Sequence, residues 1–80
     1  MHENMIKTAL ENAGVYVQEN DFSMKLTIRD LIEDSLSFIS FFVEIESLFD
    51  IEIPDEFYNR NVFGYTLEQF LHDVILPCKS

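Results

Sequence analysis

One serine in the chain stands where its hydroxyl could take part in chemistry. Ser35 follows a polar stretch, residues 20–34, and precedes a long segment with an apolar stripe, so it falls at the start of a predicted helix, directly after Asp34. A helix start presents unpaired N–H groups and a partial positive charge, which stabilise a phosphate placed there. The position suits a phosphodiester on Ser35. It also suits the simpler reading, in which Ser35 is a helix N-cap and Asp34 an ordinary acid near a positive helix end.

Ser35 lacks a partner that would make it a nucleophile by itself. A serine needs a base such as histidine within reach, and His2 and His72 belong to distant segments. We therefore expect no catalytic residue and no enzyme activity, and we expect any modification of Ser35 to be made by another enzyme. A lone cysteine, Cys78, and acids without EF-hand spacing predict no disulfide, zinc site or calcium loop.

The segments that must position Ser35 are predicted to be helical, because only two Gly and two Pro interrupt the chain. A first helix is expected from about Asn4 to Gly14, with residues 15–17 either continuing it or forming an extended piece. Residues 20–34 are predicted to be a long irregular connection, since Asn, Asp, Ser and Thr favour local turns. A loop of this length in a small domain is often functional.

The clearest helical pattern runs from about Ser35 to about Asp50. Its predicted core stripe consists of Phe38, Phe41, Phe42, Ile45, Leu48 and Phe49. Three further apolar residues, Leu36, Ile39 and Val43, fall outside this stripe and form a second, narrower strip. This strip either packs against a neighbouring segment or remains available to a partner.

The C-terminal third predicts two more helices. An extended link at residues 51–53 leads to a short helix over 54–58, because proline is tolerated at a first helical position. Residues 59–65 are expected to be a loop. The last helix is predicted to begin at Thr66 with a capping-box spacing and to stop at Pro77. The expected fold is all-α, with three main helices and a short one packed as a bundle.

The composition fits one small domain over residues 1–80. The chain is 48% hydrophobic, which is enough for a core, and carries 15 acidic against 5 basic residues, a net charge of −10. That charge argues against binding nucleic acid or an anionic membrane surface. No apolar run approaches the roughly 20 residues of a membrane span, and the N-terminus lacks the pattern of a signal peptide. We expect a cytoplasmic protein that does not insert into membranes.

The motifs around Ser35 resemble those of the acyl carrier protein family. The run Asp34-Ser35-Leu36 is followed, one helix later, by Phe-Asp-Ile-Glu-Ile-Pro-Asp-Glu at residues 49–56, and the likeness covers about residues 26–76. The resemblance implies a four-helix bundle with a long first loop and a short third helix. It also implies that Ser35 carries a 4′-phosphopantetheine arm, framed by Asp34 and Leu36, which holds acyl intermediates as thioesters for fatty acid, polyketide or related biosynthesis.

The resemblance also implies a set of partners. These are a phosphopantetheinyl transferase, an acyl- or aminoacyl-loading enzyme, and downstream synthases with basic docking surfaces, all meeting a monomeric carrier. In this family the bundle interior can shelter the bound chain, and the eight Phe of this sequence either fill that space or reshape it.

Two alternatives stay open. Arg60 followed by Phe63 resembles a pattern of D-alanyl carrier proteins, which would make the cargo an amino acid. Ile32 and Ser37 depart from the family's usual Gly and Asp, at places near the docking site of the modifying transferase. These departures favour an unmodified acidic adaptor with the same fold.

The charge pattern predicts a docking face beside Ser35. From Asp30 to Asn59 the chain has acids but no Lys or Arg, which would steer basic partners toward this region. The predicted docking residues are Leu36, Ile39, Val43, Glu44 and Glu46. The apolar members would supply short-range contact that salt does not screen. The alternative is an ordinary solvated, charged face.

Overall fold

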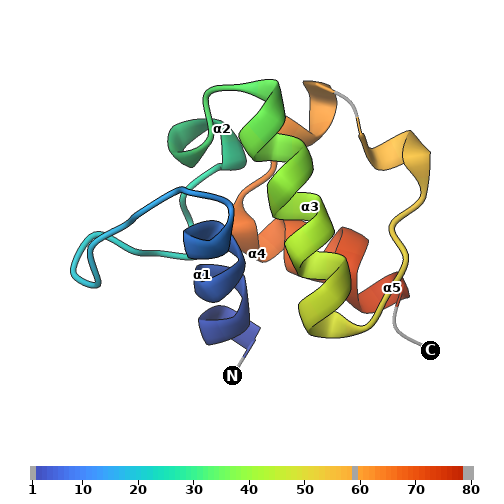
Figure 1. Cartoon of the computed structure of the whole chain (residues 1–80), viewed down its shortest axis with the longest axis horizontal. Helices are drawn as coiled ribbons and strands as arrows, with labels where there is room; N and C mark the ends of the chain where they lie inside the picture. Colours follow the sequence, from blue (N-terminus) through green and yellow to red (C-terminus); the bar gives the residue numbers. More distant parts are fainter. Residues whose placement is uncertain (1, 59, 79–80) are drawn as a thin grey trace.

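The structure, a computed structural model, describes residues 2–58 and 60–78. These residues form a mostly helical domain in which helices α1 to α5 are joined by loops and by short 3-10 and π-helical turns (Figure 1). The described part contains no β-strand, and its extended pairing is an isolated bridge between Thr27 and Thr66. The predicted all-α class is therefore confirmed. Asn59 and the side chain of Arg60 lie outside what the structure describes.

Helix α1 spans His2–Asn12, so it begins earlier than expected. Its buried residues are Ile6, Ala9 and Leu10, which recur at helical spacing. Gly14 ends the helix in the left-handed region at φ 89°, and the N–H of Val15 donates to the carbonyl of Leu10 at 2.8 Å. A helix end of this kind needs a residue at position 14 that tolerates a positive φ, and glycine tolerates it. Residues 15–17 consequently leave the helix rather than continue it.

The connection before Ser35 is more ordered than predicted, because it contains a one-turn helix. Helix α2 spans Ile28–Leu31 and starts at a reciprocal capping box. The Thr27 hydroxyl accepts from the Asp30 N–H, and the Asp30 carboxylate accepts from the Thr27 N–H, each at 3.1 Å. The Thr-x-x-Asp spacing signals a helix start. The prediction of an irregular stretch holds for residues 20–27 and 32–34 and was wrong for residues 28–31, because it weighed only the turn-forming residues.

The same segment is fastened to the start of the C-terminal helix. Backbone hydrogen bonds of 2.9 Å run from the N–H of Ile28 to Tyr65 and from the N–H of Leu67 to Leu26, on either side of the isolated bridge. The bridged residues are themselves the N-caps of helices α2 and α4. These backbone hydrogen bonds hold the starts of α2 and α4 next to each other.

Helix α3 spans Ser35–Phe49, close to the predicted bounds. It ends where Asp50 adopts φ 55° and the N–H of Ile51 donates to the carbonyl of Glu46 at 3.1 Å. The predicted core stripe is confirmed except that Leu48 is half-buried. The buried residues of this helix are Phe38, Phe41, Phe42, Ile45 and Phe49.

Two short 3-10 helices follow the link at 51–53. The predicted short helix is present as η1, Asp55–Phe57, with Pro54 as its N-cap. The prediction of a loop after this helix was wrong, because Arg60–Gly64 forms a second 3-10 helix, η2. Val62 is buried within η2, and its carbonyl accepts from the N–H of Tyr65 at 3.0 Å. Burial of an apolar side chain holds this segment in a regular turn.

The C-terminal segment is one continuous helical run. It consists of α4, Leu67–Phe70, a π-helical stretch η3, Leu71–Ile75, and α5, Leu76–Cys78. The predicted stop at Pro77 was wrong, since Pro77 lies inside α5. The N–H of Leu76 donates to the carbonyl five residues back, so the turn before the proline is wider than an α-turn. A wider turn accommodates a residue that lacks an N–H and clashes with the preceding turn of a regular helix.

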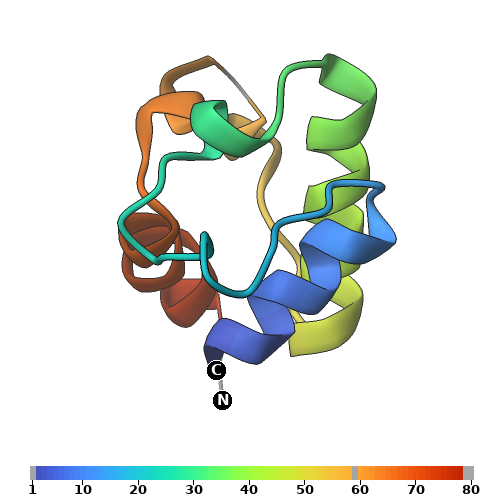
Figure 2. The same cartoon turned by 90° about the vertical axis from the view of Figure 1, so that its left-hand side faces the viewer.

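Helices α1 and α3 lie against each other, and the run α4–α5 closes the opposite side of the domain (Figures 1 and 2). Helix α2 contacts η2 near the start of α3. One core joins all of these elements. Its buried residues are Ile6, Ala9, Leu10, Ile28, Ile32, Phe38, Phe41, Phe42, Ile45, Phe49, Ile53, Val62, Leu67, Phe70, Leu71, Val74 and Ile75.

Two neighbouring residues of α3 test this division between core and surface. Phe42 is fully buried, whereas Val43 is half exposed. Phe42→Ala should lower the free energy of unfolding by about 3–5 kcal/mol, because it removes a large ring and leaves a cavity. Val43→Ala, the matched control, should cost less than about 1 kcal/mol. Urea unfolding followed by circular dichroism measures both, and equal losses would contradict the assigned orientation of the helix.

Candidate functional site

Asp34, not Ser35, caps helix α3. The Asp34 backbone is extended, and its carboxylate accepts from the N–H of Ser37 at 2.6 Å. Its carbonyl accepts from the N–H of Phe38 at 3.2 Å, the first bond of the helix. The reading in which Ser35 is the N-cap is therefore wrong. Ser35 is the first helical residue, its side chain is exposed, and its hydroxyl has no bonding partner among the described residues.

The cap keeps a negative charge beside Ser35. The N–H of Ser37 is the main cause that lowers the pKa of Asp34 below its ordinary value, followed by the Ser37 side chain, and the N–H of Leu36 adds to the effect. Partial burial opposes this shift by more than the Leu36 N–H adds to it, but the Ser37 hydrogen bonds outweigh it. Asp34 is thus ionised at neutral pH and holds the first turn of α3, which leaves the Ser35 hydroxyl without a structural role.

The residues that depart from the family pattern do not cover Ser35. Ile32 is only 1% exposed and forms the C-cap of α2, where its N–H donates to the carbonyl of Ile28 at 2.8 Å. It therefore faces the core rather than an approaching enzyme. Ser37 belongs to the Asp34 cap. Both residues hold the junction between α2 and α3, a role that a resemblance based on surface recognition did not anticipate.

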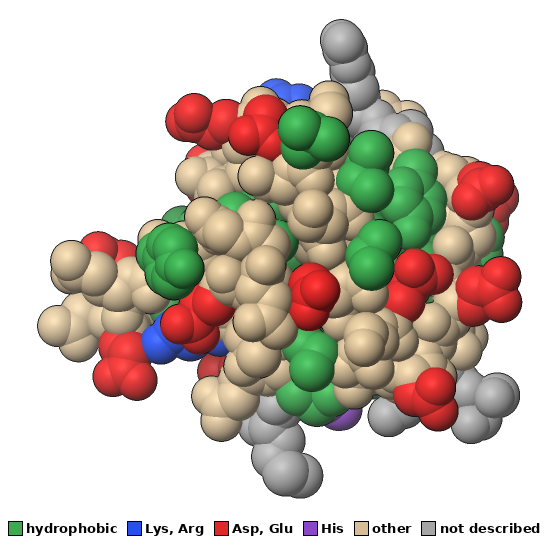
Figure 3. Space-filling view, in the orientation of Figure 1, with side chains coloured by type: hydrophobic (Ala, Val, Ile, Leu, Met, Phe, Trp, Pro, Cys, Tyr) green, Lys and Arg blue, Asp and Glu red, His purple; other side chains and the backbone are tan. Residues whose placement is uncertain are grey.

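The second apolar strip of α3 is exposed. Leu36 is 79%, Ile39 48% and Val43 50% exposed, so the alternative in which they pack against a neighbouring segment is wrong. In the space-filling view, hydrophobic side chains gather over the upper part of α3 with acidic side chains around them (Figure 3). The strip begins one residue after Ser35 and continues for two turns of the helix.

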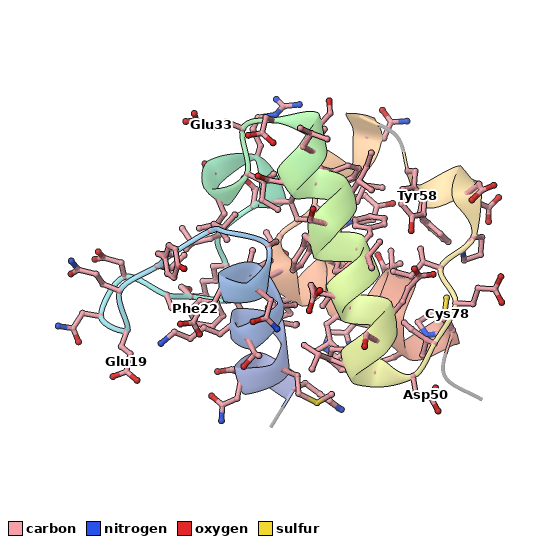
Figure 4. The ribbon with its side chains drawn as sticks, viewed as in Figure 1. Glu19, Phe22, Glu33, Asp50, Tyr58 and Cys78 are labelled. Atoms are coloured by element: carbon pink, nitrogen blue, oxygen red, sulfur yellow. The ribbon has the colours of Figure 1, made fainter. Side chains whose placement is uncertain are left out.

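The two predicted docking acids have internal partners. Glu44 accepts a hydrogen bond from the side chain of Asn12 at 3.1 Å, which ties α3 to the end of α1. Glu46 accepts from the N–H of Ile53 at 2.8 Å and holds the link that follows the helix. Burial first, and then Glu46 and Asp55, raise the pKa of Tyr58, which lies beside that link (Figure 4).

The histidines and the cysteine considered in the sequence analysis do not serve Ser35. The His2 ring is 5.8 Å from that of Phe49, the last residue of α3, and α3 is about 20 Å long. Since His2 lies at the far end of α3 from Ser35, it supplies Ser35 with no base, and the open groove that it lines together with His72 does not include Ser35. Cys78 is half-buried, and burial first, then Glu46, raises the pKa of its thiol.

Two kinds of feature are missing from the described residues. No group of three or more His, Cys, Asp or Glu among them is arranged to hold a metal ion. No helix formed by them is long and apolar enough to cross a membrane.

Comparison with known protein families, with characterised proteins and with solved structures finds no match for the chain. The case for a function therefore rests on the residues themselves. Sequence reasoning named Ser35, Asp34 and the exposed strip of α3. The Thr27 capping box and the bridge between Thr27 and Thr66, which hold the segment before α3 in place, were not predicted. The Thr-x-x-Asp spacing of residues 27–30 could have indicated the capping box.

The cap of α3 can be tested by its pH dependence. Asp34→Ala should lower the thermal midpoint at neutral pH, because it removes the hydrogen bond to the Ser37 N–H. Since folding lowers the pKa of Asp34, its stabilisation is present above the ordinary value of 3.8 and is lost as the pH falls through the lowered pKa. The difference between Asp34→Ala and the wild type should therefore shrink in acid.

Glu33→Ala is the matched control for the cap, because Glu33 is the neighbouring exposed acid and does not cap the helix. Its midpoint should stay near that of the wild type at neutral pH. A Glu33 variant as unstable as Asp34→Ala would show that net charge, not the cap, governs the start of α3.

Proposed function

We propose that the chain is a carrier protein of the acyl carrier type, with a four-helix-bundle fold and 4′-phosphopantetheine attached to Ser35. The observation that carries the proposal is that Asp34 caps α3 while the Ser35 hydroxyl is exposed and unengaged at the positive end of the helix. A serine held in that way suits covalent modification better than a structural role. The fold proposal rests on the long first loop and the short helix η1 after α3.

The residues present fit such a group. The Oγ of Ser35 is the atom to which the phosphate would be joined. The partial positive charge of the helix start offsets part of the repulsion between the added phosphate and the ionised Asp34 carboxylate. When bound, the group supplies a flexible arm whose thiol carries acyl or aminoacyl cargo. The chain's own part is to present Ser35, with Asp34 holding the helix turn and Leu36 exposed beside it. Because the described histidines are remote, the proton of Ser35 must be removed by a base of the transferase.

The exposed strip of α3 is proposed as the docking face for the transferase, the loading enzyme and downstream synthases. Leu36, Ile39 and Val43 supply an apolar centre next to Ser35. The acid-only stretch from Asp30 to Asn59 supplies a negative surround. This combination suits a partner with a basic rim and an apolar centre, since charge guides encounter and apolar contact holds the complex. Glu44 and Glu46 add charge to this field while also serving their internal contacts.

Attachment at Ser35 is tested with coenzyme A and a broad-specificity phosphopantetheinyl transferase. Intact mass spectrometry should show the wild-type chain gaining the mass of one phosphopantetheinyl group. Ser35→Ala should gain none, whereas Ser40→Ala, which removes another exposed serine of α3, should gain as much as the wild type. A wild type that gains no mass would support the unmodified adaptor instead.

The docking face is tested by the kinetics of the same reaction. Ile39→Ser should raise KM for the carrier about tenfold, which corresponds to about 1.4 kcal/mol of lost binding. Its thermal midpoint should stay close to that of the wild type, because Ile39 is half exposed. The control is Tyr16→Ser, which removes an apolar side chain that is 82% exposed on the loop after α1. A similar rise in KM for both variants would contradict a specific face on α3.

A further inference from the structure

The interior next to Ser35 is filled by aromatic rings. Phe38 lies one turn into α3 and is 5% exposed, and its ring centroid is 4.3 Å from that of Phe63 in η2. The Phe38 ring centroid is also 4.5 Å from that of Phe42, which lies four residues further along the core stripe. Aromatic rings whose centroids lie this close together are in direct contact. The Phe38–Phe63 pair therefore closes the interior immediately below the start of the helix.

The ring contacts continue through the domain. Phe42 lies 4.6 Å from Tyr58 and 5.2 Å from Phe70, between centroids. Phe70 in turn lies 5.6 Å from Phe41. The column, defined as these rings together with Phe38 and Phe63, joins α3 to η2, to α4 and to Tyr58, the residue that follows η1. Interiors packed in this way resist insertion of additional methylene groups.

The groove lined by His2 and His72 offers no substitute space. Its lining contains no residue of α3 and none of residues 32–35, and one of its members, His2, contacts the last residue of α3. Its lining also includes Glu3, Lys25 and Glu68, charged groups that an alkyl chain would desolvate.

We propose that the cargo carried on Ser35 stays outside the bundle and is a short or polar acyl group rather than a long alkyl chain. This inference rests on the proposed function for the existence of a cargo, and on the aromatic column for its location. A long alkyl chain attached at Ser35 would have to remain outside the core, where only the side facing the exposed strip of α3 could be covered and the other methylenes would stay in water, which is unfavourable. A short or polar group has no such need for shelter.

The test attaches alkyl chains chemically, so it does not depend on a transferase. In the full chain carrying Cys78→Ser and Ser35→Cys, the introduced thiol is alkylated with a maleimide that bears a flexible spacer and an ethyl or a decyl end. The two adducts should have the same thermal midpoint and the same NMR shifts for the ring protons of Phe42 and Phe70. A higher midpoint for the decyl adduct, with shifted ring signals, would overturn the inference.

Phe63→Ala provides the positive control, because it removes the ring that covers Phe38 from a half-buried position. In this background the decyl adduct should gain stability over the ethyl adduct as its chain enters the space left by the ring. Phe63→Leu serves the same purpose if the alanine variant does not fold. A chain-length effect absent from the folded variant would contradict the role of the Phe38–Phe63 contact as the barrier.

The two proposals fail in different ways. Loss of the transferase-dependent mass gain would remove the proposed function and leave the chemically made adducts informative about the interior. A chain-length effect in the wild-type interior would overturn the external location of the cargo and leave Ser35 as the attachment site.

Discussion

The hydrogen bond from the Ser37 N–H to the Asp34 carboxylate is the interaction on which the rest of the site depends. A helix start has N–H groups that need partners, and Asp34 satisfies one of them at 2.6 Å. If Ser35 made this bond, its hydroxyl would be engaged in the backbone and turned away from any incoming group. Because Asp34 makes this hydrogen bond, Ser35 is the first residue of the helix rather than its cap, and its side chain is exposed. Both residues of the Asp-Ser pair therefore have a physical reason to be where they are.

Helix α3 has an inner face that belongs to the aromatic column and an outer face that carries the exposed strip. Phe38 and Phe42 commit their rings to other rings of the core, so the inner face is occupied. Leu36 and Ile39, on the outer face, have no such partners and remain exposed beside Ser35. Docking on the outer face, as proposed, needs a rigid helix beneath that face. Dense aromatic packing supplies this rigidity.

The sequence predicted the parts of the fold that follow from periodicity, and α3 is the clearest example. Its apolar spacing gives its extent and its buried face, while the Asp34 cap and the left-handed Asp50 set its two ends. Features set by backbone pairing or by local winding were not predicted. Helix α2 depends on a capping box and on hydrogen bonds to a segment nearly forty positions away. The inclusion of Pro77 in α5 depends on a π-helical turn, which apolar spacing does not encode. The same holds for the site: the position of Ser35 at a predicted helix start, directly after Asp34, identified the serine, but the hydrogen bond to the Ser37 N–H decided which residue caps the helix.

The most direct test of the central claim is peptide mapping by mass spectrometry of the protein isolated from the cells that naturally make it. The account predicts that the peptide containing Ser35 carries a phosphopantetheinyl group, and that fragmentation places the group on that serine rather than on Ser37 or Ser40. A Ser35 peptide found only in unmodified form, in cells whose other carrier proteins are modified, would contradict the account.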